Sequence, residues 1–259
     1  IDTYGCQMNV ADSEVVVSIL SDHGYSHTVN MEEAGLILIN TCSIRDNAEQ
    51  RIWGRLKAIG HLKKKNPETV IGLIGCMAER LKETVMEKEQ IVDIVAGPDA
   101  YRDLPLLISE AESGHKAVNV LLSREETYAD ILPVRMDLNG VTSFVSIMRG
   151  CNNMCAYCVV PYVRGAERSR DPESIISEIK VLSDKGYREV TLLGQNVDSY
   201  GFRKDGRLIS FPELLEKAAL ADPMIRIRFS TSHSKDLSDE LLHIMADHRN
   251  ICRHINLPS

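Results

Sequence analysis

The chain has 259 residues, 44% of them hydrophobic, which is enough for one large domain or two ordinary ones around a proper core. Its formal net charge of −7 offers no general attraction for nucleic acid, and no apolar run approaches the length of a membrane span. Seven cysteines and no secretory leader at the start of the sequence lead us to expect a reducing, cytoplasmic setting, where thiols bind metals more often than they form disulfides. The sequence begins without Met and stops directly after a strand-like segment, so we expect a piece of a longer protein.

The first half of the chain alternates helical segments with apolar runs. Helical spacing and stop signals predict helices over residues 11–23, 46–65 and 78–88, and a further short helix between Pro105 and Gly114. Apolar runs typical of buried parallel strands lie at residues 35–40, 70–75 and 92–96. The alternation predicts an α/β fold, with an N-terminal doubly wound parallel domain over residues 1–122.

Three cysteines in this half come directly after strand-like segments: Cys6, Cys42 and Cys76. The carboxyl ends of parallel strands share one edge of a sheet, and open α/β sheets bind ligands at that edge, so we expect the three thiols to lie together. Three separate buried thiols are the alternative, because cysteine is often buried. The same structural position for all three favours an iron–sulfur site with three thiolate ligands.

The second half repeats the alternation after a linker predicted over residues 123–139, where charges mix with Pro133 and no periodicity is present. Strands are predicted at 144–148, 189–193, 226–230 and 254–257, and helices at 172–185, 212–221 and 238–246. Repeated strand–helix units of this length predict a partial (β/α) barrel over residues 140–259. So few strands cannot close a barrel, and we therefore expect it to be truncated at the C-terminus.

The densest cysteine motif follows the first of these strands. Cys151, Cys155 and Cys158 have the spacing C-x3-C-x2-C, and a loop at a strand end can turn three thiolates toward one point. A structural zinc site would need a second short Cys or His pair, which the sequence lacks, and a disulfide cannot use three cysteines. The motif therefore predicts an iron–sulfur cluster with one iron position open to a small molecule.

This spacing, with the aromatic Tyr157 before the last cysteine, resembles the radical S-adenosylmethionine (SAM) superfamily. Taken with the cysteines of the first half, the chain resembles the methylthiotransferases, a branch of that superfamily. The segments that carry the resemblance are Thr3–Asn9 (TYGCQMN), Asn40–Ser43 (NTCS), Gly75-Cys76 and Arg149–Gly165. The first segment is similar to the branch that modifies tRNA, and differs from the branches that act on a ribosomal protein or on threonylcarbamoyl-adenosine.

The resemblance implies two 4Fe–4S clusters and SAM as cofactors. Cys151, Cys155 and Cys158 would hold the cluster whose open iron binds SAM. An auxiliary cluster that carries the sulfur would be held by Cys6, Cys42 and Cys76.

The implied reaction is methylthiolation of C2 of N6-isopentenyladenosine 37 in the tRNA anticodon loop, started by a 5′-deoxyadenosyl radical made from SAM. The implied partners are tRNA, bound by a full-length protein with a C-terminal RNA-binding (TRAM) domain, and an electron donor such as flavodoxin or ferredoxin. Two alternatives stay open: methylthiolation of a ribosomal protein aspartate, and a non-catalytic iron–sulfur scaffold or electron carrier.

Other polar side chains near predicted strand ends are weaker candidates. Contacts to SAM are expected of Tyr157, Gln195, Asn196 and Ser232, with core packing or ordinary capping and loop hydrogen bonds as the alternative. Contacts to RNA phosphate are expected of Arg164, Arg168 and Arg170, with solvated loop charge as the alternative. We expect Cys252, which has no partner cysteine nearby, to be a buried thiol.

Overall fold

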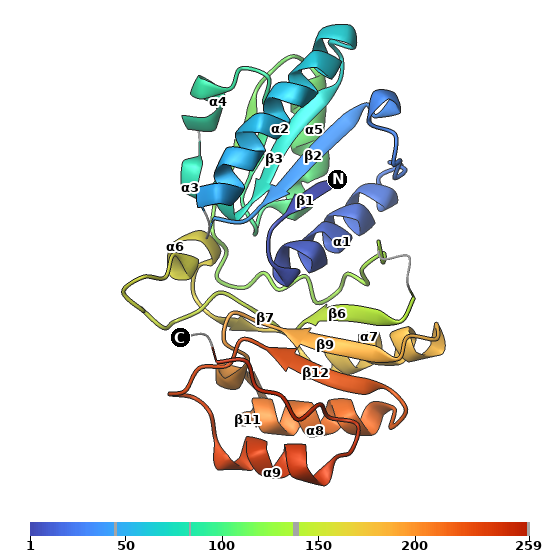
Figure 1. Ribbon diagram of the computed structural model, residues 1–259, viewed down its shortest axis with the longest axis vertical. Coiled ribbons are helices and arrows are strands. Elements are labelled where there is room, and N and C mark those ends of the chain that lie inside the picture. Colours follow the sequence, from blue (N-terminus) through green and yellow to red (C-terminus); the bar gives the residue numbers. More distant parts are fainter. Residues whose placement is uncertain (44–45, 83, 137–139, 258–259) are drawn as a thin grey trace. The chain divides into compact units, whose positions relative to one another are not determined.

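The computed structural model describes the chain outside residues 44–45, 83, 137–139 and 258–259 (Figure 1). It divides into two compact units. The first comprises Ile1–Arg124 and Met154–Gly165, and the second comprises Glu125–Asn153 and Ala166–Ser259. The boundary after Arg124 lies near residue 122, where the N-terminal domain is expected to end. The segment Met154–Gly165, which carries Cys155 and Cys158, groups with the first unit.

The first unit contains a five-stranded sheet in which every neighbouring pair of strands is parallel. The strands follow one another across the sheet in chain order: β1 (Asp2–Tyr4), β2 (Leu36–Thr41), β3 (Val70–Gly75), β4 (Ile94–Ala96) and β5 (Ala117–Asn119). The sequence prediction missed β5, because a three-residue strand carries almost no periodic signal.

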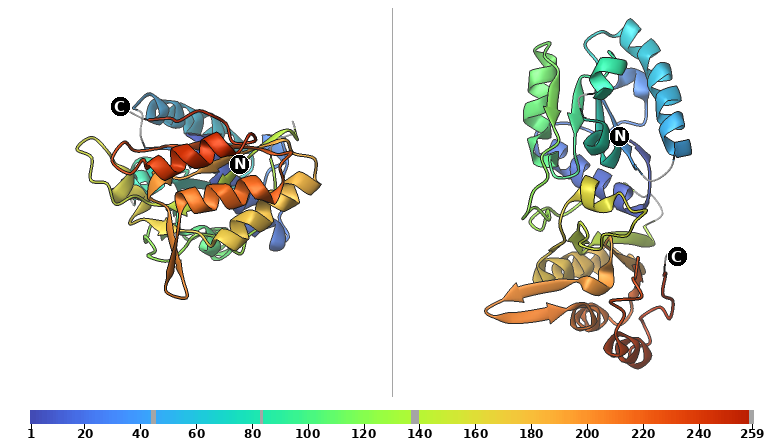
Figure 2. Two further views of the ribbon diagram at one scale, coloured as in Figure 1. Left: turned by 90° about the horizontal axis from the view of Figure 1, so that it is seen from below. Right: turned by 90° about the vertical axis from the view of Figure 1, so that its left-hand side faces the viewer.

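Helices pack on both faces of this sheet. They are α1 (Gln7–Asp22), α2 (Asp46–Lys65), α3 (Cys76–Leu81), α4 (Thr84–Lys88) and α5 (Leu104–Glu112), with the short 3-10 turns η1 (Met31–Glu33) and η2 (Tyr101–Asp103). The short helix α6 (Val160–Arg164) packs beside α3. The views of Figure 2 place α2 and α5 on opposite faces. On the α2 face, Ile52, Leu56 and Ile59 pack in one cluster with Ile39 and Leu73 of the strands.

Two helix predictions in this unit need correction. The first helix begins at Gln7 rather than at residue 11, because Asn9 Oδ1 accepts the Cys6 amide and closes the first turn. The single helix predicted over 78–88 is two helices, since Lys82 at the end of α3 has a φ of 51° that no α-helix can continue.

The second unit is built on three parallel strands in the order β12-β9-β6, namely β6 (Thr142–Ser146), β9 (Glu189–Leu193) and β12 (Arg226–Ser230). Its helices are α7 (Pro172–Asp184), α8 (Phe211–Ala221) and α9 (Asp239–Asp247), with the 3-10 turn η3 (Val197–Ser199). Two antiparallel pairs complete it: β7 (Met148–Arg149) with β8 (Arg168–Ser169), and β10 (Gly201–Lys204) with β11 (Arg207–Ser210).

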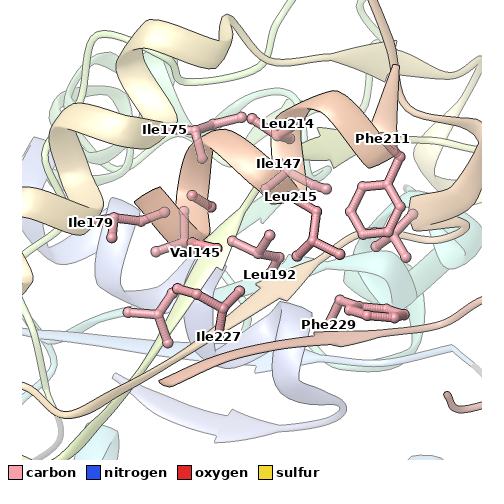
Figure 3. Packing of buried hydrophobic residues seen from close by; sticks show 14 of the residues in the cluster. Val145, Ile147, Ile175, Ile179, Leu192, Phe211, Leu214, Leu215, Ile227 and Phe229 are labelled. Atoms are coloured by element: carbon pink, nitrogen blue, oxygen red, sulfur yellow. The ribbon is translucent and has the colours of Figure 1, made fainter. Parts of the chain in front are cut away.

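The core of the second unit lies between this sheet and its helices. Figure 3 shows Val145, Leu192 and Ile227 from the three strands directed at Ile175 and Leu215 from α7 and α8. Phe211 and Phe229 extend this packing through an edge-to-face contact with ring centroids 5.3 Å apart.

The predicted fourth strand of this unit is wrong. Within the described residues, the segment after α9 forms a single parallel bridge, Ile227 to Ile251, and residues 254–257 are not in a strand. The chain instead lies beside β12 through a few hydrogen bonds, including Ser232 N to the Asn256 carbonyl at 3.0 Å. No helix in the described part of the chain is both long and apolar enough to cross a membrane.

Candidate functional site

The register of the first sheet brings three strand ends level. Tyr4 of β1 pairs with Thr41 of β2, and Thr41 pairs with Gly75 of β3. The Cys42 amide then donates to the Tyr4 carbonyl at 2.9 Å, which holds the first two strand ends together beyond the ladder. Cys42 and Cys76 directly follow Thr41 and Gly75, and Cys6 follows Tyr4 after one glycine, so the three cysteines predicted to converge all lie just beyond these strand ends.

The three thiols interact with one another at this edge. Cys6 is exposed, whereas Cys42 and Cys76 are buried. A hydrogen bond with the Cys42 thiol, aided by the positive charge of Arg164, lowers the pKa of Cys6 to about 6, although partial desolvation of the sulfur by its neighbours opposes this decrease. Cys6 is therefore largely thiolate at neutral pH, and thiolate is the form that binds iron.

Two asparagines fix the backbone around these thiols. Asn9 Nδ2 donates to Asn40 Oδ1 at 3.0 Å, and Asn40 Nδ2 donates to the Asn9 carbonyl at 2.9 Å and to Ser13 Oγ at 2.9 Å. Asn9 Oδ1 accepts from the Cys6 amide and from the Cys6 thiol, each at 3.3 Å. Both amides are fully buried, so this network ties α1 to the ends of β1 and β2.

Glycines make room for this network. A Cβ on Gly5 would lie 2.3 Å from Asn9 Oδ1, and a Cβ on Gly75 would lie 2.4 Å from Asn40 Oδ1. Gly75 also has a φ of 90°, a conformation that residues with a side chain rarely adopt. At the first strand end, Gly5 lets Asn9 reach the amide of Cys6, and at the third, Gly75 leaves room for the Asn40 side chain that bonds Asn9.

A buried ion pair borders the same thiols. Arg164 Nη2 donates to Asp12 Oδ2 at 2.8 Å, and Arg164 Nε donates to the Cys76 sulfur at 3.2 Å. Burial works to lower the pKa of Arg164, but the Asp12 carboxylate and the Cys76 thiol outweigh it and hold that pKa well above its ordinary value. Burial also raises the pKa of the Cys76 thiol, which the Arg164 charge opposes.

These residues fit an iron–sulfur cluster better than a single metal ion. In the described part of the chain, no three His, Cys, Asp or Glu side chains are close enough to surround one ion. A cluster of several irons spaces its ligands more widely, and cysteine thiolates are its usual protein ligands. A donor set of three cysteines beside a buried guanidinium matches that chemistry.

The three cysteines of the second set are assigned to different units. Cys151 is buried in the second unit, and its sulfur accepts the Asn153 amide at 3.4 Å. Cys155 and Cys158 are half-buried on the segment that groups with the first unit, where the Cys158 amide donates to the Cys155 carbonyl at 2.9 Å. Their joint role as cluster ligands stays a prediction from their spacing.

Polar side chains gather at the carboxyl ends of β9 and β12 in the second unit. Asn196 Nδ2 donates to Asp236 Oδ2 at 2.7 Å, and Ser232 Oγ donates to Asp198 Oδ1 at 3.1 Å. Two amide oxygens, Gln195 Oε1 and Asn196 Oδ1, are buried without a hydrogen-bond partner among the described residues. Such orphaned acceptors are costly, so they fit a ligand that brings ammonium or hydroxyl donors.

The carboxyl groups of Asp198 and Glu167 are partly shielded from water. Burial raises the pKa of Asp198, and the nearby Asp236 charge adds to the shift. Burial likewise raises the pKa of Glu167, which accepts a hydrogen bond from Ser199 Oγ at 2.6 Å. Sequence reasoning missed these acids, because nothing in their spacing along the chain links them to the strand ends.

The arginines differ from their expected role. Arg164, Arg168 and Arg170 are between 4% and 6% exposed, so they do not present a surface to RNA phosphate. Arg170 pairs with Glu178, and Arg164 pairs with Asp12. Their burial argues against both the phosphate contact and the solvated-charge alternative, because a buried guanidinium needs an internal carboxylate.

Two other candidates can be compared with expectation. Tyr157 is 79% exposed, which excludes the alternative of core packing, and its contact to SAM stays a prediction. Cys252 is half-buried rather than buried. Sequence reasoning overlooked Asp12, although an acid within the otherwise apolar stripe of α1 is itself a signal for a buried partner.

Comparison with known proteins divides the chain in the same way as its motifs. Residues 1–97 match a family described as uncharacterized protein family UPF0004, and residues 145–258 match the radical SAM superfamily. A tRNA-2-methylthio-N(6)-dimethylallyladenosine synthase from Amoebophilus asiaticus is 56% identical over the whole of this chain. A synthase of the same name from Flavobacterium johnsoniae is 55% identical. The chain spans 55% and 56% of the length of these two relatives.

Solved structures with a similar fold are more distant in sequence. The radical S-adenosylmethionine methyltransferase TsrM from Kitasatospora setae, with tryptophan and a SAM analogue bound, gives a TM-score of 0.65 at 14% identity, covering 98% of this chain and 57% of that one. The same enzyme with cobalamin and a [4Fe-4S] cluster bound gives 0.67 at 14% identity, covering 96% and 57%. At this identity the likeness concerns the fold alone.

Proposed function

Because the chain belongs to the radical SAM methylthiotransferase family, we propose that its protein transfers a methylthio group to C2 of N6-isopentenyladenosine in tRNA. The relatives named for this reaction share more than half of their aligned residues with this chain. A C2–H bond of adenine is unactivated, so the reaction needs radical chemistry from cofactors, and the protein supplies position and electrostatics. The bound clusters would supply the electron that cleaves SAM to a 5′-deoxyadenosyl radical, together with the sulfur.

The observation that carries this proposal is the alignment of three cysteines at one sheet edge. Cys6, Cys42 and Cys76 would hold the auxiliary cluster, with Asn9 and Asn40 fixing the backbone around them. This second thiol set, found in addition to the C-x3-C-x2-C motif, supports sulfur insertion over an activity that only cleaves SAM.

The second cysteine set and the strand ends of the second unit would bind the other cofactors. Cys151, Cys155 and Cys158 would hold the cluster that binds SAM, as their C-x3-C-x2-C spacing predicts. The buried acceptors Gln195 Oε1 and Asn196 Oδ1 would receive donors of the SAM amino acid or ribose. Ser232 would keep Asp198 in place beside them.

Iron and sulfide analysis tests the ligand assignment. After anaerobic reconstitution of the full-length protein, we expect Cys6→Ala and Cys151→Ala each to lose about half of the iron and sulfide, from different clusters. Cys252→Ala is the matched control, because this cysteine belongs to neither set, and it should keep the full content. Loss of all iron in either variant would contradict two independent sites.

Product analysis tests the reaction. With reductant and SAM, the loaded full-length protein should form 5′-deoxyadenosine, and tRNA should gain the mass of a methylthio group. Gain of that mass on a ribosomal protein would favour the first alternative. Intact clusters without 5′-deoxyadenosine would favour a non-catalytic scaffold. The names of the relatives favour neither alternative.

The partners follow from the same proposal. The substrate would be the anticodon loop of tRNA, with the base flipped out of its stack to reach the cofactors. A tRNA substrate implies a cytoplasmic enzyme. Each turnover consumes electrons, so a low-potential donor such as flavodoxin or ferredoxin would be required.

A further inference from the structure

Arg164 combines two contacts that the proposed reaction does not account for. Its Nε donates to the sulfur of Cys76, and its Nη2 is bound by the Asp12 carboxylate. The side chains of Arg164 and Asp12 are 4% and 1% exposed, so the pair is removed from water and salt. Burying an ion pair carries a desolvation cost, and hydrophobic residues of similar volume would stabilise the fold equally well. The presence of this pair beside the Cys76 thiol therefore points to a role other than stability.

The hydrogen bonds orient the Arg164–Asp12 pair relative to Cys76. The carboxylate binds Nη2, while Nε is left to face sulfur. The positive group therefore lies nearer to Cys76 than the negative group that balances it. Tyr101 supports the same carboxylate, with its hydroxyl 3.5 Å from Asp12 Oδ2.

Resting on the proposed cluster at Cys6, Cys42 and Cys76, we propose that Arg164 is a positioning residue that raises the reduction potential of that cluster by donating to Cys76. One electron from a chemical reductant adds one negative charge to the cluster, and no covalent bond forms or breaks. Hydrogen bonds to the ligand sulfurs and the local net charge set the potentials of iron–sulfur clusters. A charged donor to sulfur stabilises the reduced state more than the oxidised state, because the reduced state is more negative.

Arg164 also lies six residues after Cys158, so the segment that supplies two ligands of one predicted cluster supplies the donor to the other.

The test uses full-length protein in which Cys151, Cys155 and Cys158 are all replaced by Ala, so that only the first cluster can form. Iron content is measured first, and the midpoint potential is then measured by a dithionite titration monitored by electron paramagnetic resonance. Arg164→Met should disfavour reduction by about tenfold, a shift of about 59 mV to more negative potential. Arg164→Lys keeps the charge and should recover part of this loss.

The Asp12→Asn variant distinguishes an electrostatic effect on the reduction potential from disruption of the fold. It removes the negative charge behind Arg164, so the potential should move in the positive direction, opposite to Arg164→Met. Arg55→Met is the matched control, because Arg55 in the same unit also pairs with a carboxylate, Asp2, and donates to a sulfur, but that sulfur is the thioether of Met31. It should leave the potential unchanged.

A spectroscopic readout covers the case in which Arg164→Met fails to hold iron. In protein that retains Arg164 and carries 15N-labelled arginine, the reduced cluster should show an electron–nuclear coupling to 15N that disappears in Arg164→Lys. Absence of that coupling, or an unchanged potential in a cluster-bearing Arg164→Met variant, would overturn the inference. Absence of iron from the parent protein would instead refute the proposed cluster itself.

Discussion

Gly75 is constrained both by its backbone conformation and by the atoms packed against it. Its φ of 90° disfavours any side chain, and its Cα hydrogen faces the Asn40 amide and the Thr41 carbonyl. We expect Gly75→Ala to destabilise the first unit by about 2–5 kcal/mol, from backbone strain together with the clash. Urea unfolding followed by the fluorescence of Trp53 measures this, because the single tryptophan lies in α2 of that unit.

Gly24→Ala provides the control for Gly75. Gly24 has a similar φ of 87°, but a Cβ there would meet nothing within 4 Å. Its cost should be confined to backbone strain, about 1–2 kcal/mol. Equal effects of the two substitutions would show that the close approach of Asn40 contributes nothing.

Glu79 makes the stability of the first unit depend on pH. Its side chain is buried, and Oε2 has no hydrogen-bond partner in the described residues. Burial, reinforced by Asp99 and opposed by Lys82, raises the pKa of Glu79 to about 7. The folded state thus binds the Glu79 proton more tightly than the unfolded chain does. The contribution of this proton to the free energy of unfolding is complete below about pH 4 and is lost as the pH rises to about 7.

Glu79→Gln should remove this dependence. Relative to the natural chain, the variant should gain on the order of 2–3 kcal/mol of unfolding free energy between pH 5 and pH 8, again measured through Trp53. Glu110→Gln, an exposed glutamate on α5, should show no such gain. A constant difference in unfolding free energy between Glu79→Gln and the natural chain across this range would exclude burial as the cause.

At the scale of single residues, the sequence points to six cysteines through their spacing and their position after strands, and their role as ligands stays a prediction. The side chains that surround Cys6, Cys42 and Cys76 were not predicted. Asn9 and Asn40 are 31 residues apart, so their contact exists only once the sheet has formed. For the same reason, the arginine prediction missed the burial that makes Arg164 a partner of Asp12.

At the scale of elements, α7 depends on a buried carboxylate. Glu178 pairs with both Arg135 and Arg170, and all three side chains are buried. Glu178→Gln removes the carboxylate that pairs with both buried cations, so we expect the second unit to lose about 3–5 kcal/mol. Hydrogen exchange of the α7 amides, measured by mass spectrometry, should show the loss.

Glu173→Gln tests whether charge on α7 matters by itself. Glu173 lies on the same helix and pairs with Lys204, but its side chain is 77% exposed. Exposed pairs contribute less than about 1 kcal/mol, so protection of α7 should change little. Comparable losses in both variants would contradict a special role for the buried pairing.

Long elements were predictable, and short ones were not. The strands β3, β9 and β12 and the helix α2 have the expected bounds, because their apolar runs or helical spacing extend over several positions. The pairs β7–β8 and β10–β11 were missed. Asp205-Gly206 between β10 and β11 is a recognised hairpin signal, and both residues have positive φ, so this hairpin could have been found.

At the scale of the whole molecule, charge limits how RNA can be bound. A formal net charge of −7 gives phosphate no general attraction, and the arginines near the second cysteine set are buried. We expect the 259-residue chain to bind a tRNA anticodon stem–loop weakly and with a shallow salt dependence. Fluorescence anisotropy at several salt concentrations measures both, and a steep slope would reveal a basic surface.

The two-unit organisation was predictable in outline because each half has its own apolar pattern and forms its own core. The grouping of Met154–Gly165 with the first unit was not predictable. It depends on α6 packing beside α3 and on the ion pair of Arg164, neither of which leaves a mark on local periodicity.

The level strand ends also bear on how such proteins can diverge. Insertions within the helices and loops between β1, β2 and β3 lengthen the gaps between cysteines without displacing the thiols, whereas a slip of one residue inside a strand turns the next side chain to the opposite face. The intervals between Cys6, Cys42 and Cys76 can therefore change among related proteins, whereas the register of β1, β2 and β3 cannot. A pattern search keyed to fixed intervals will overlook distant kin, and one keyed to a cysteine closing each of three successive strands will retrieve them.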